Sequence, residues 1–116
     1  MKLRLVIYEE PEDPYFNMAV EEAIPRARGC GIIPDTLRIW RNMNAVIIGY
    51  FQKAEEEVNL NVASSIGAAV VRRFTGGGAV YHDLGNLNYA LSLASTGRTA
   101  TLDYIFRELT KGPVEA

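Results

Sequence analysis

The residues with the most chemical potential in this sequence lie together between Arg72 and Asn86. Two arginines are followed there by three consecutive glycines, Gly76, Gly77 and Gly78, and then by the only histidine of the chain. Glycine allows backbone conformations that are closed to other residues, and it leaves no side chain between the main chain and a ligand. Successive N–H groups can then converge on an anion, which predicts an anion-binding nest.

The two arginines, Arg72 and Arg73, occupy adjacent positions of a predicted strand. Their side chains therefore leave on opposite faces of the sheet, so one can enter a given pocket while the other supports the structure. A guanidinium group binds a carboxylate or a phosphate through two parallel hydrogen bonds. Thr75 and Asn86 add neutral donors to the same stretch.

Three familiar types of site do not fit this stretch. A Walker loop needs Gly-Lys-Ser/Thr at the start of a helix, and a dinucleotide fingerprint needs glycine where Tyr81 stands. His82 and Asp83 are neighbours in an extended segment, so a Ser-His-Asp relay is not indicated. A structural alternative stays open, in which the glycines form a turn, the arginines lie at a solvated edge and His82 is a core or surface histidine.

Alternating and apolar runs predict the strands that hold this stretch. They cover residues 3–8, 37–41, 45–50, 68–74, 79–82 and 87–93. Asn42-Met43-Asn44 separates two of them and predicts a hairpin. The glycine loop is thus expected between two strands, and its anion site does not depend on a helix terminus.

Helical spacing predicts three helices. The first begins at Pro14 with Asp13 as its N-cap, and Pro25 is expected to kink or stop it. A short helix capped by Asn59 or Asn61 ends at Gly67. The expected apolar positions of the first helix are Phe16, Ala19, Val20, Ala23 and Ile24, and those of the third are Leu102, Ile105, Phe106 and Leu109. These elements predict an α+β domain with a mixed or antiparallel sheet flanked by helices.

Composition limits the classes of function. The chain has 116 residues, a formal charge of −2 and 48% hydrophobic residues, which is typical of one soluble globular domain. The sequence lacks the strongly basic character that is typical of nucleic-acid-binding domains. It also has no apolar run that is long enough for a membrane span. The single cysteine, Cys30, fits a reducing, cytoplasmic setting and leaves too few ligands for a zinc site.

The segment Arg-Arg-Phe-Thr-Gly-Gly-Gly-Ala-Val-Tyr-His-Asp-Leu-Gly-Asn-Leu-Asn, residues 72–88, resembles the signature of lipoate-protein ligase A and its relatives in the biotin/lipoate ligase family. The similarity extends to Pro-Tyr-Phe-Asn-Met-Ala-Val-Glu-Glu at 14–22, Leu-Arg-Ile-Trp-Arg at 37–41 and Val-Ile-Ile-Gly-Tyr-Phe-Gln at 46–52. Biotin ligases carry a different, arginine-rich glycine loop, so the lipoate branch is favoured.

The resemblance implies a fold like the catalytic cores of biotin ligases and class II aminoacyl-tRNA synthetases. It also implies a two-step reaction, in which lipoate and ATP with Mg²⁺ give lipoyl-adenylate, and the adenylate then acylates a lysine of a lipoyl-carrier domain. The expected acceptors are carrier domains of 2-oxoacid dehydrogenase complexes or the glycine cleavage H protein. Carried over position by position, the lipoate and adenylate pocket comprises Arg73, Thr75, Gly76, Gly77, Gly78, Val80, His82, Asn86, Glu21 and the Tyr81 backbone. Val46, Ile48 and Val80 are expected to form an apolar slot for the acyl chain.

The essential lysine of the family lies in a Lys-Ile/Val-x-Gly motif on a later strand, and Lys111 before Gly112-Pro113 does not match it. No catalytic residue is therefore assigned within the chain. Residues 1–116 are expected to be the N-terminal portion of a catalytic domain that is completed by a second chain. Two alternatives stay open, namely a non-catalytic lipoate- or adenylate-binding remnant and an octanoyl or lipoyl transferase that uses an acyl-carrier donor.

Overall fold

A computed structural model describes residues 2–97, 104, 107–108 and 111 of the chain. Its described elements are β1 (Leu3–Val6), α1 (Pro14–Gly29), β2 (Asp35–Trp40), β3 (Asn44–Ile48), α2 (Ala54–Glu57), α3 (Leu60–Ser65), β4 (Ala69–Arg72), β5 (Val80–Asp83) and β6 (Asn88–Ser92). The third predicted helix, around Leu102 to Leu109, falls largely outside the described residues.

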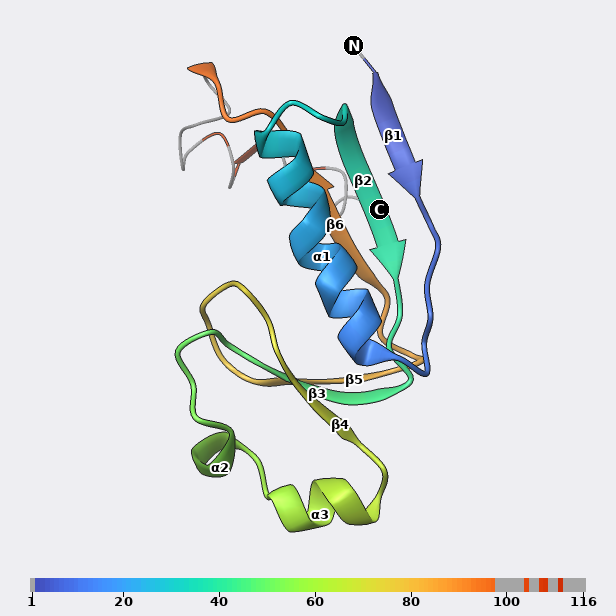
Figure 1. Cartoon of the computed structure of the whole chain (residues 1–116), viewed down its shortest axis with the longest axis vertical. Coiled ribbons are helices and arrows are strands. Elements are labelled where there is room, and N and C mark those ends of the chain that lie inside the picture. Colours follow the sequence, from blue (N-terminus) through green and yellow to red (C-terminus); the bar gives the residue numbers. More distant parts are fainter. Residues whose placement is uncertain (1, 98–103, 105–106, 109–110, 112–116) are drawn as a thin grey trace.

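The strands form two separate three-stranded sheets. In the first, β2 pairs in parallel with β1 and antiparallel with β6, and in the second, β3 pairs in parallel with β4 and antiparallel with β5. Figure 1 shows the second sheet lying across one end of the first, with α1 beside both. This arrangement confirms the predicted α+β class and shows that both sheets are mixed.

The predicted hairpin between residues 37–41 and 45–50 is wrong, because β2 and β3 belong to different sheets. The connecting residue Asn42 is completely buried and hydrogen-bonded, so residues 41–43 form a fixed corner between the sheets. Sequence signals for a tight turn do not distinguish a hairpin from such a corner, since Asn is favourable in both.

Helix α1 begins as predicted. Asp13 Oδ1 accepts a hydrogen bond of 3.0 Å from the Phe16 N–H, and Pro14 occupies the first turn, where its missing donor costs nothing. Pro25 does not end the helix, which continues to Gly29. Proline removes one intrahelical bond, and the turn beyond it is held by Arg28, whose Nε lies 2.7 Å from Asp35 Oδ1.

The inward face of α1 differs from the predicted apolar stripe. Pro14, Asn17, Met18 and Ile24 are buried, whereas Phe16 is 39% exposed. Ile24 is buried as predicted, but the stripe as a whole is wrong because the inward face carries two polar residues, Asn17 and Glu21, which a search for apolar spacing assigns to solvent. Both residues can face inward because Asn17 is hydrogen-bonded to Glu10 and Asn42, and Glu21 is paired with Arg38.

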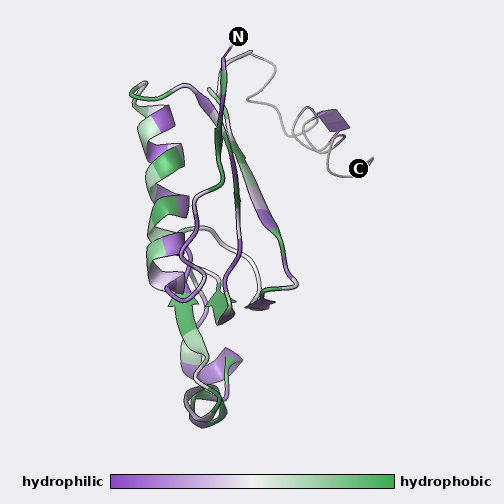
Figure 2. Ribbon diagram, turned by 90° about the vertical axis from the view of Figure 1, so that its right-hand side faces the viewer, coloured by the Kyte–Doolittle hydropathy of each residue, from purple (hydrophilic) through white to green (hydrophobic). Residues whose placement is uncertain are grey.

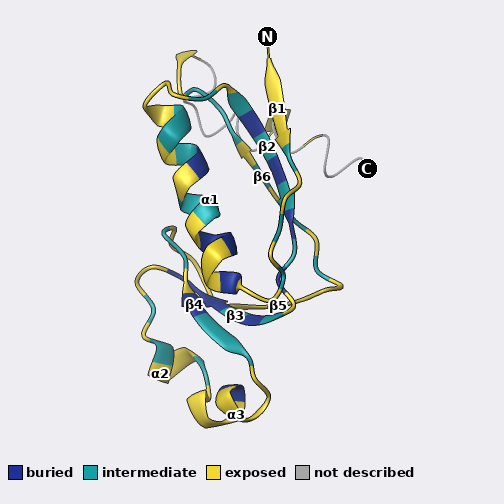
Figure 3. Cartoon of the chain, turned by 45° about the vertical axis from the view of Figure 1, so that its right-hand side comes forward, coloured by how far each residue is buried: buried dark blue, intermediate teal, exposed yellow. Residues whose placement is uncertain are grey.

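The core lies where α1 meets the second sheet, and it is formed by Met18, Ala45, Ile47 and Val71. Figure 3 shows the buried positions along α1, β2 and β3. The first sheet turns Thr36, Arg38 and Trp40 toward α1, and all three are buried. Its other face exposes Leu3, Leu5, Tyr89 and Leu91. The hydropathy colours of Figure 2 show apolar segments along these strands.

Within the part of the chain that the structure describes, no helix has the length and apolar character needed to cross a membrane.

Asn17 gives a direct test of this arrangement. Replacing Asn17 with Ala removes an amide that bonds the main chain of Glu10 and the side chain of Asn42, leaving buried polar groups without partners. We expect the free energy of unfolding to fall by about 3 kcal/mol in urea titrations. Asn61→Ala, at an exposed position of α3, is the control and should change it by less than about 0.5 kcal/mol. Equal effects of the two substitutions would contradict this account of the corner.

Candidate functional site

A cavity of about 180 Å³ lies between α1, β2, β3 and the glycine loop. Five residues of the predicted site line it, namely Glu21, Arg73, Thr75, Val80 and His82. Three others that sequence reasoning did not assign to the site complete it, namely Met18, Trp40 and Ile47. The structure therefore brings together charged and apolar side chains from four separate parts of the chain.

The other five predicted residues do not line this cavity. The three glycines form the loop that carries Thr75 and Val80. The Tyr81 side chain is exposed, and its hydroxyl donates a 2.7 Å hydrogen bond to Asn44 Oδ1. Asn86 Nδ2 donates to Asn88 Oδ1 over 2.9 Å. Binding roles stay predictions for all ten residues, including the five that line the cavity.

The apolar wall of the cavity uses the other face of β3 from the one expected. Ile47 lines it in place of Val46 and Ile48, and Ile47 is paired with Val80 in the antiparallel register of β3 and β5. Side chains alternate along a strand, so a shift of one residue exchanges the two faces. The apolar run 45–48 contains no polar residue that could have fixed this phase from the sequence.

The glycine loop lies against the end of β3, as its position between β4 and β5 predicts. Tyr50 N–H donates to the Thr75 carbonyl over 2.9 Å, and Arg73 N–H donates to the Ile48 carbonyl over 3.0 Å. Gly77 has φ of +102°, a conformation that L side chains rarely adopt. A Cβ atom added to Gly49 would lie 2.1 Å from the Gly77 carbonyl oxygen. Gly49 thus belongs to the site because it lets the loop approach.

The two arginines have different hydrogen-bond partners, but β4 ends at Arg72 and both side chains line one cleft, so the expectation that only one of them enters a given pocket is wrong for that cleft. Arg73 lines the cavity, and it donates from Nε and Nη2 to the Gly76 carbonyl and from Nη1 to the Ile47 carbonyl. A guanidinium has five N–H groups, so these three contacts leave two for a ligand. Arg72 Nη1 instead donates to the carbonyls of Gly49, Tyr50 and Gln52 and holds the turn after β3.

A second hollow adjoins Arg73 on its other side. This cleft has a volume of about 320 Å³, and Arg26, Tyr50 and Arg72 are among the residues that line it together with Arg73. Arg73 therefore borders both hollows and is placed to contact a ligand that extends from one into the other.

Glu21 and Arg38 form an ion pair at the inner end of the site. Arg38 Nη1 lies 3.2 Å from Glu21 Oε2 and donates to the Asn17 carbonyl over 2.9 Å, and its guanidinium stacks 4.1 Å from the Trp40 ring centroid. Burial raises the pKa of Glu21, although Arg38 acts in the opposite direction. Burial also lowers the pKa of Arg38, more than Glu21 raises it.

Buried donors without partners surround this ion pair. Arg38 Nε and Nη2 and the Trp40 indole N–H have no hydrogen-bond partner in the described structure. Buried polar groups are normally paired, so these donors give the inner wall an excess of positive, donor character. Strand alternation in Leu37-Arg38-Ile39-Trp40 already places Arg38 and Trp40 on one face, and this signal could have identified them from the sequence.

His82 is 9% exposed and does not pair with Asp83, as expected. Its Nδ1 lies 3.0 Å from Asn42 Nδ2, whereas Asp83 Oδ1 accepts from the Gly85 N–H over 2.8 Å. The pKa of His82 is lowered from its usual value of 6.5, first by burial and then by the positive charge of Arg73. The imidazole is therefore neutral at physiological pH.

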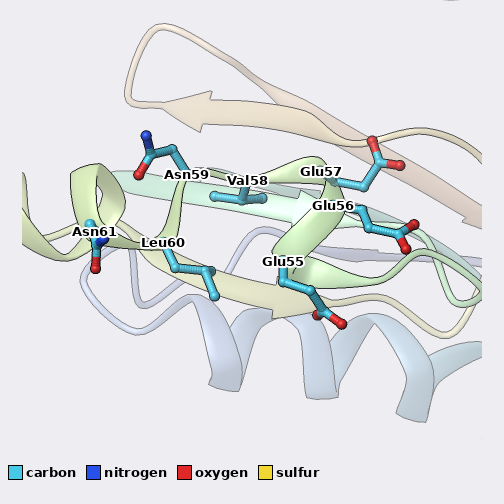
Figure 4. Close-up of a pocket in the computed structure, with 7 residues that line it drawn as sticks. All are labelled: Glu55, Glu56, Glu57, Val58, Asn59, Leu60 and Asn61. Atoms are coloured by element: carbon cyan, nitrogen blue, oxygen red, sulfur yellow. The ribbon is translucent and has the colours of Figure 1, made fainter.

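A larger hollow of about 570 Å³ lies over α2 and the start of α3, where Glu55, Glu56 and Glu57 follow one another. Figure 4 shows these three carboxylates pointing in different directions. In the described residues, no group of three or more His, Cys, Asp or Glu side chains is arranged to hold a metal ion. The acidic run is the solvated face that its sequence predicts.

Fold and site together define an α+β domain with an apolar cavity that ends at an arginine and a glycine loop. The lipoyl protein ligase A/B catalytic domain model matches residues 13–116. The chain is also 42% identical over 116 residues to lipoate-protein ligase A subunit 1 of Thermoplasma acidophilum, covering 100% of this chain and 43% of that protein. The chain belongs to the lipoyl protein ligase A/B catalytic domain family.

Solved structures agree with this assignment. A lipoate-protein ligase A bound with ATP shares 43% identity at a TM-score of 0.83, covering 92% of this chain and 42% of that one. A putative lipoate protein ligase from T. acidophilum with bound lipoic acid has 44% identity and a TM-score of 0.71, covering 78% and 37%. The bipartite lipoate protein ligase of T. acidophilum, studied with its E2 lipoyl domain, has 44% identity and a TM-score of 0.72, covering 78% and 35%. The chain therefore spans less than half the length of these relatives.

Gly49 tests the geometry of the loop. In Gly49→Ala the new methyl group would overlap the Gly77 carbonyl, so the loop must move away from β3. We expect the backbone amide signals of residues 73–80 to shift in ¹H–¹⁵N spectra and the free energy of unfolding to fall by about 2 kcal/mol. Gly29→Ala is the matched control, since a Cβ there meets no atom within 4 Å. Unchanged loop signals in Gly49→Ala would contradict the close approach.

The lowered pKa of His82 predicts how the free energy of unfolding depends on pH. Because its pKa is lowered in the folded state, the unfolded chain binds a proton more readily as the pH falls below 6.5. The contribution of His82 to stability should be complete above pH 6.5 and should decrease below it. The measurement is the difference in free energy of unfolding between the wild type and His82→Gln from pH 8 to about pH 5. The raised pKa of Glu21 acts with the opposite sign, but it is present in both proteins and largely cancels. A difference that grows on acidification would show that the histidine is stabilised in its charged form.

Proposed function

We propose that this chain forms the lipoate- and adenylate-binding part of an ATP-dependent lipoate-protein ligase. The observation that carries the proposal is the cavity that joins the apolar side chains of Met18, Ile47 and Val80 to Arg73 and His82. Such a site suits a ligand with an apolar chain and one anionic end. The relatives with bound lipoic acid and with bound ATP support this choice of ligand.

In the proposed reaction, an oxygen of the lipoate carboxylate attacks the α-phosphorus of ATP. The bond between that phosphorus and the bridging oxygen to the β-phosphate breaks, which gives lipoyl-adenylate and pyrophosphate. A neutral lysine amine of the acceptor then attacks the acyl carbon, so that an amide forms, AMP leaves and the amine proton passes to solvent. Cationic donors placed where charge develops favour the first step. Arg73, which lines the cavity, is the residue of this chain to which we assign this role.

The two hollows beside Arg73 suggest how the intermediate lies. The acyl chain would occupy the cavity lined by Ile47 and Val80, and the nucleotide would extend past Arg73 toward the cleft that Arg26 and Arg72 line. The glycine loop between them would offer main-chain N–H groups to the phosphate. Mg²⁺ enters the proposal with ATP, whose phosphates bind it.

The proposal also includes partners. The Thermoplasma relative is bipartite and was studied with an E2 lipoyl domain, which supports a partner polypeptide and a lipoyl-domain acceptor for this chain as well. The exposed apolar face of the first sheet, with Leu3, Leu5, Tyr89 and Leu91, would suit further polypeptide. Carrier domains of 2-oxoacid dehydrogenase complexes are the acceptors we propose, with the glycine cleavage H protein as another. The free, exposed Cys30 fits a reducing cytoplasm.

The direct test measures pyrophosphate release from ATP and lipoate, and lipoylation of an E2 lipoyl domain. We expect turnover when the chain is joined by the remaining portion of the catalytic domain, and none from residues 1–116 alone. Turnover by residues 1–116 alone would contradict the need for further polypeptide. Acyl transfer from an octanoyl-carrier protein without ATP would show a transferase instead, and failure to bind lipoate or a lipoyl-adenylate analogue in any combination would show a non-catalytic remnant.

Gly77 and Gly78 provide a matched pair for the ligand site. Gly77→Ala is strained by its φ of +102° and would place a Cβ 2.7 Å from Arg73 Nη2, whereas a Cβ at Gly78 meets no atom within 4 Å. We expect Gly77→Ala to weaken binding of a non-hydrolysable lipoyl-adenylate analogue at least about tenfold, or 1.4 kcal/mol, in calorimetry. Gly78→Ala should change it much less, and the far-UV circular dichroism of both variants should match the wild type. Equal losses of binding in the two variants would count against a specific role for the Gly77 conformation.

A further inference from the structure

A chain of buried side-chain amides connects the start of α1 to His82. The Glu10 N–H donates to Asn17 Oδ1 over 3.0 Å, and Asn17 Nδ2 donates to the Glu10 carbonyl over 2.7 Å. Asn17 Nδ2 also lies 2.8 Å from Asn42 Oδ1, and Asn42 Nδ2 lies 3.0 Å from His82 Nδ1. Asn17 and Asn42 are fully buried, so water cannot replace these partners.

The main-chain N–H and carbonyl of Glu10 determine the orientation of the Asn17 amide. Reversing the Asn17 amide would place its NH₂ group against the Glu10 N–H and its oxygen against the Glu10 carbonyl, so both bonds would be lost. Asn17 Nδ2, which also lies 3.3 Å from the Arg41 carbonyl, therefore faces Asn42 with N–H groups, so the Asn42 atom opposite it must be the oxygen and the Asn42 NH₂ group is turned to the histidine. Amide orientation is often ambiguous, but here two main-chain groups of known polarity fix it.

The imidazole must accept at Nδ1, because the Asn42 NH₂ group can only donate. A neutral His82 then carries its proton on Nε2. His82 lines the cavity, and within the described residues its Nε2 has no hydrogen-bond partner. Asn42, held by Asn17, thus determines which edge of the ring can donate.

We propose that Asn17 and Asn42 are positioning residues that hold His82 as the neutral Nε2–H tautomer and present this N–H to the carboxylate oxygen of the bound acyl group. The inference rests on the proposed lipoate site. It assigns to His82 the role of a neutral donor beside the cationic Arg73, and to the two asparagines a role in the site although neither lines the cavity.

The surrounding charges agree with a neutral ring. Arg73 and Glu21 line the same cavity, and Arg38 pairs with Glu21 behind it. A second proton on His82 would sit on Nδ1, where it would face the Asn42 NH₂ group and lose its hydrogen bond. The ring can therefore donate to an anionic ligand without adding a second positive charge beside Arg73.

The test uses the fact that His82 is the only histidine in the chain. In long-range ¹H–¹⁵N spectra of the ¹⁵N-labelled wild type above pH 7, we expect Nδ1 to have the shift of an unprotonated nitrogen and Nε2 that of a protonated one. A wild-type spectrum with the proton on Nδ1, or with rapidly averaging tautomers, would overturn the proposal. This measurement needs neither a ligand nor a variant, so its result is independent of whether lipoate binds.

Asn42→Asp replaces the donor with a carboxylate that can only accept. We expect the proton to move to Nδ1 and the pKa of His82 to rise by at least about one unit, because the new negative charge favours the imidazolium. Asn59→Asp is the matched control, since it makes the same change at an exposed helix cap where Asp serves equally well. An unchanged tautomer in Asn42→Asp would overturn the role of Asn42. If this variant does not fold, the wild-type spectrum still decides the tautomer.

Adding lipoate to the wild type tests the role in binding. We expect the Nε2–H signal to shift and its exchange with water to slow, and Asn42→Asp to weaken lipoate binding about tenfold while Asn59→Asp leaves it unchanged. Binding that leaves the His82 signals unaltered would overturn the positioning role while retaining the lipoate site. Absence of binding to the wild type, also when the remaining portion of the catalytic domain is present, would instead contradict the proposed function.

Discussion

The buried hydrogen-bond chain from Glu10 through Asn17 and Asn42 to His82 is the constraint on which the arrangement of this protein depends. It joins the turn before α1, the corner between β2 and β3, and strand β5. Of these elements only β5 belongs to a sheet, and the corner at Asn42 connects β2 of one sheet to β3 of the other, so the hydrogen-bond chain fixes α1 at the point where the polypeptide passes between the sheets. A network of this kind specifies one arrangement, because a buried amide with a missing partner is costly.

The face of the first sheet that α1 covers is also polar, because it carries the charged residue Arg38. Arg38 is almost completely buried between Asn17, Glu21 and Trp40, and burial opposes the charged form of both members of its ion pair. Buried ion pairs are weak contributors to stability and are often replaceable by apolar residues. Glu21 lines the cavity, and Arg38 pairs with it. The apolar positions of this sheet lie on its other face, which is exposed.

Local features of the structure could be predicted from the sequence, whereas its long-range arrangement could not. The Asp13 and Asn59 caps and the glycine loop between two strands follow from neighbouring residues. The corner at Asn42 and the inward position of Asn17 depend on partners distant in sequence, and Asn42 looks like a hairpin residue in isolation. The sequence also could not show that Ile47, and not Val46 or Ile48, points into the cavity. In a continuous apolar run no polar residue indicates which side chains face which side of the sheet. Five of the ten predicted site residues nevertheless line one cavity.

The central claim is that this cavity holds the acyl chain of lipoate with its carboxylate toward Arg73 and His82. Intermolecular nuclear Overhauser effects between lipoate and the chain, recorded with the remaining portion of the catalytic domain present if binding requires it, test the claim most directly. We expect contacts from the lipoate methylene and dithiolane protons to the methyl groups of Met18, Ile47 and Val80, which line the cavity. Lipoate that binds with contacts only to other parts of the protein, or that does not bind at all, would contradict it.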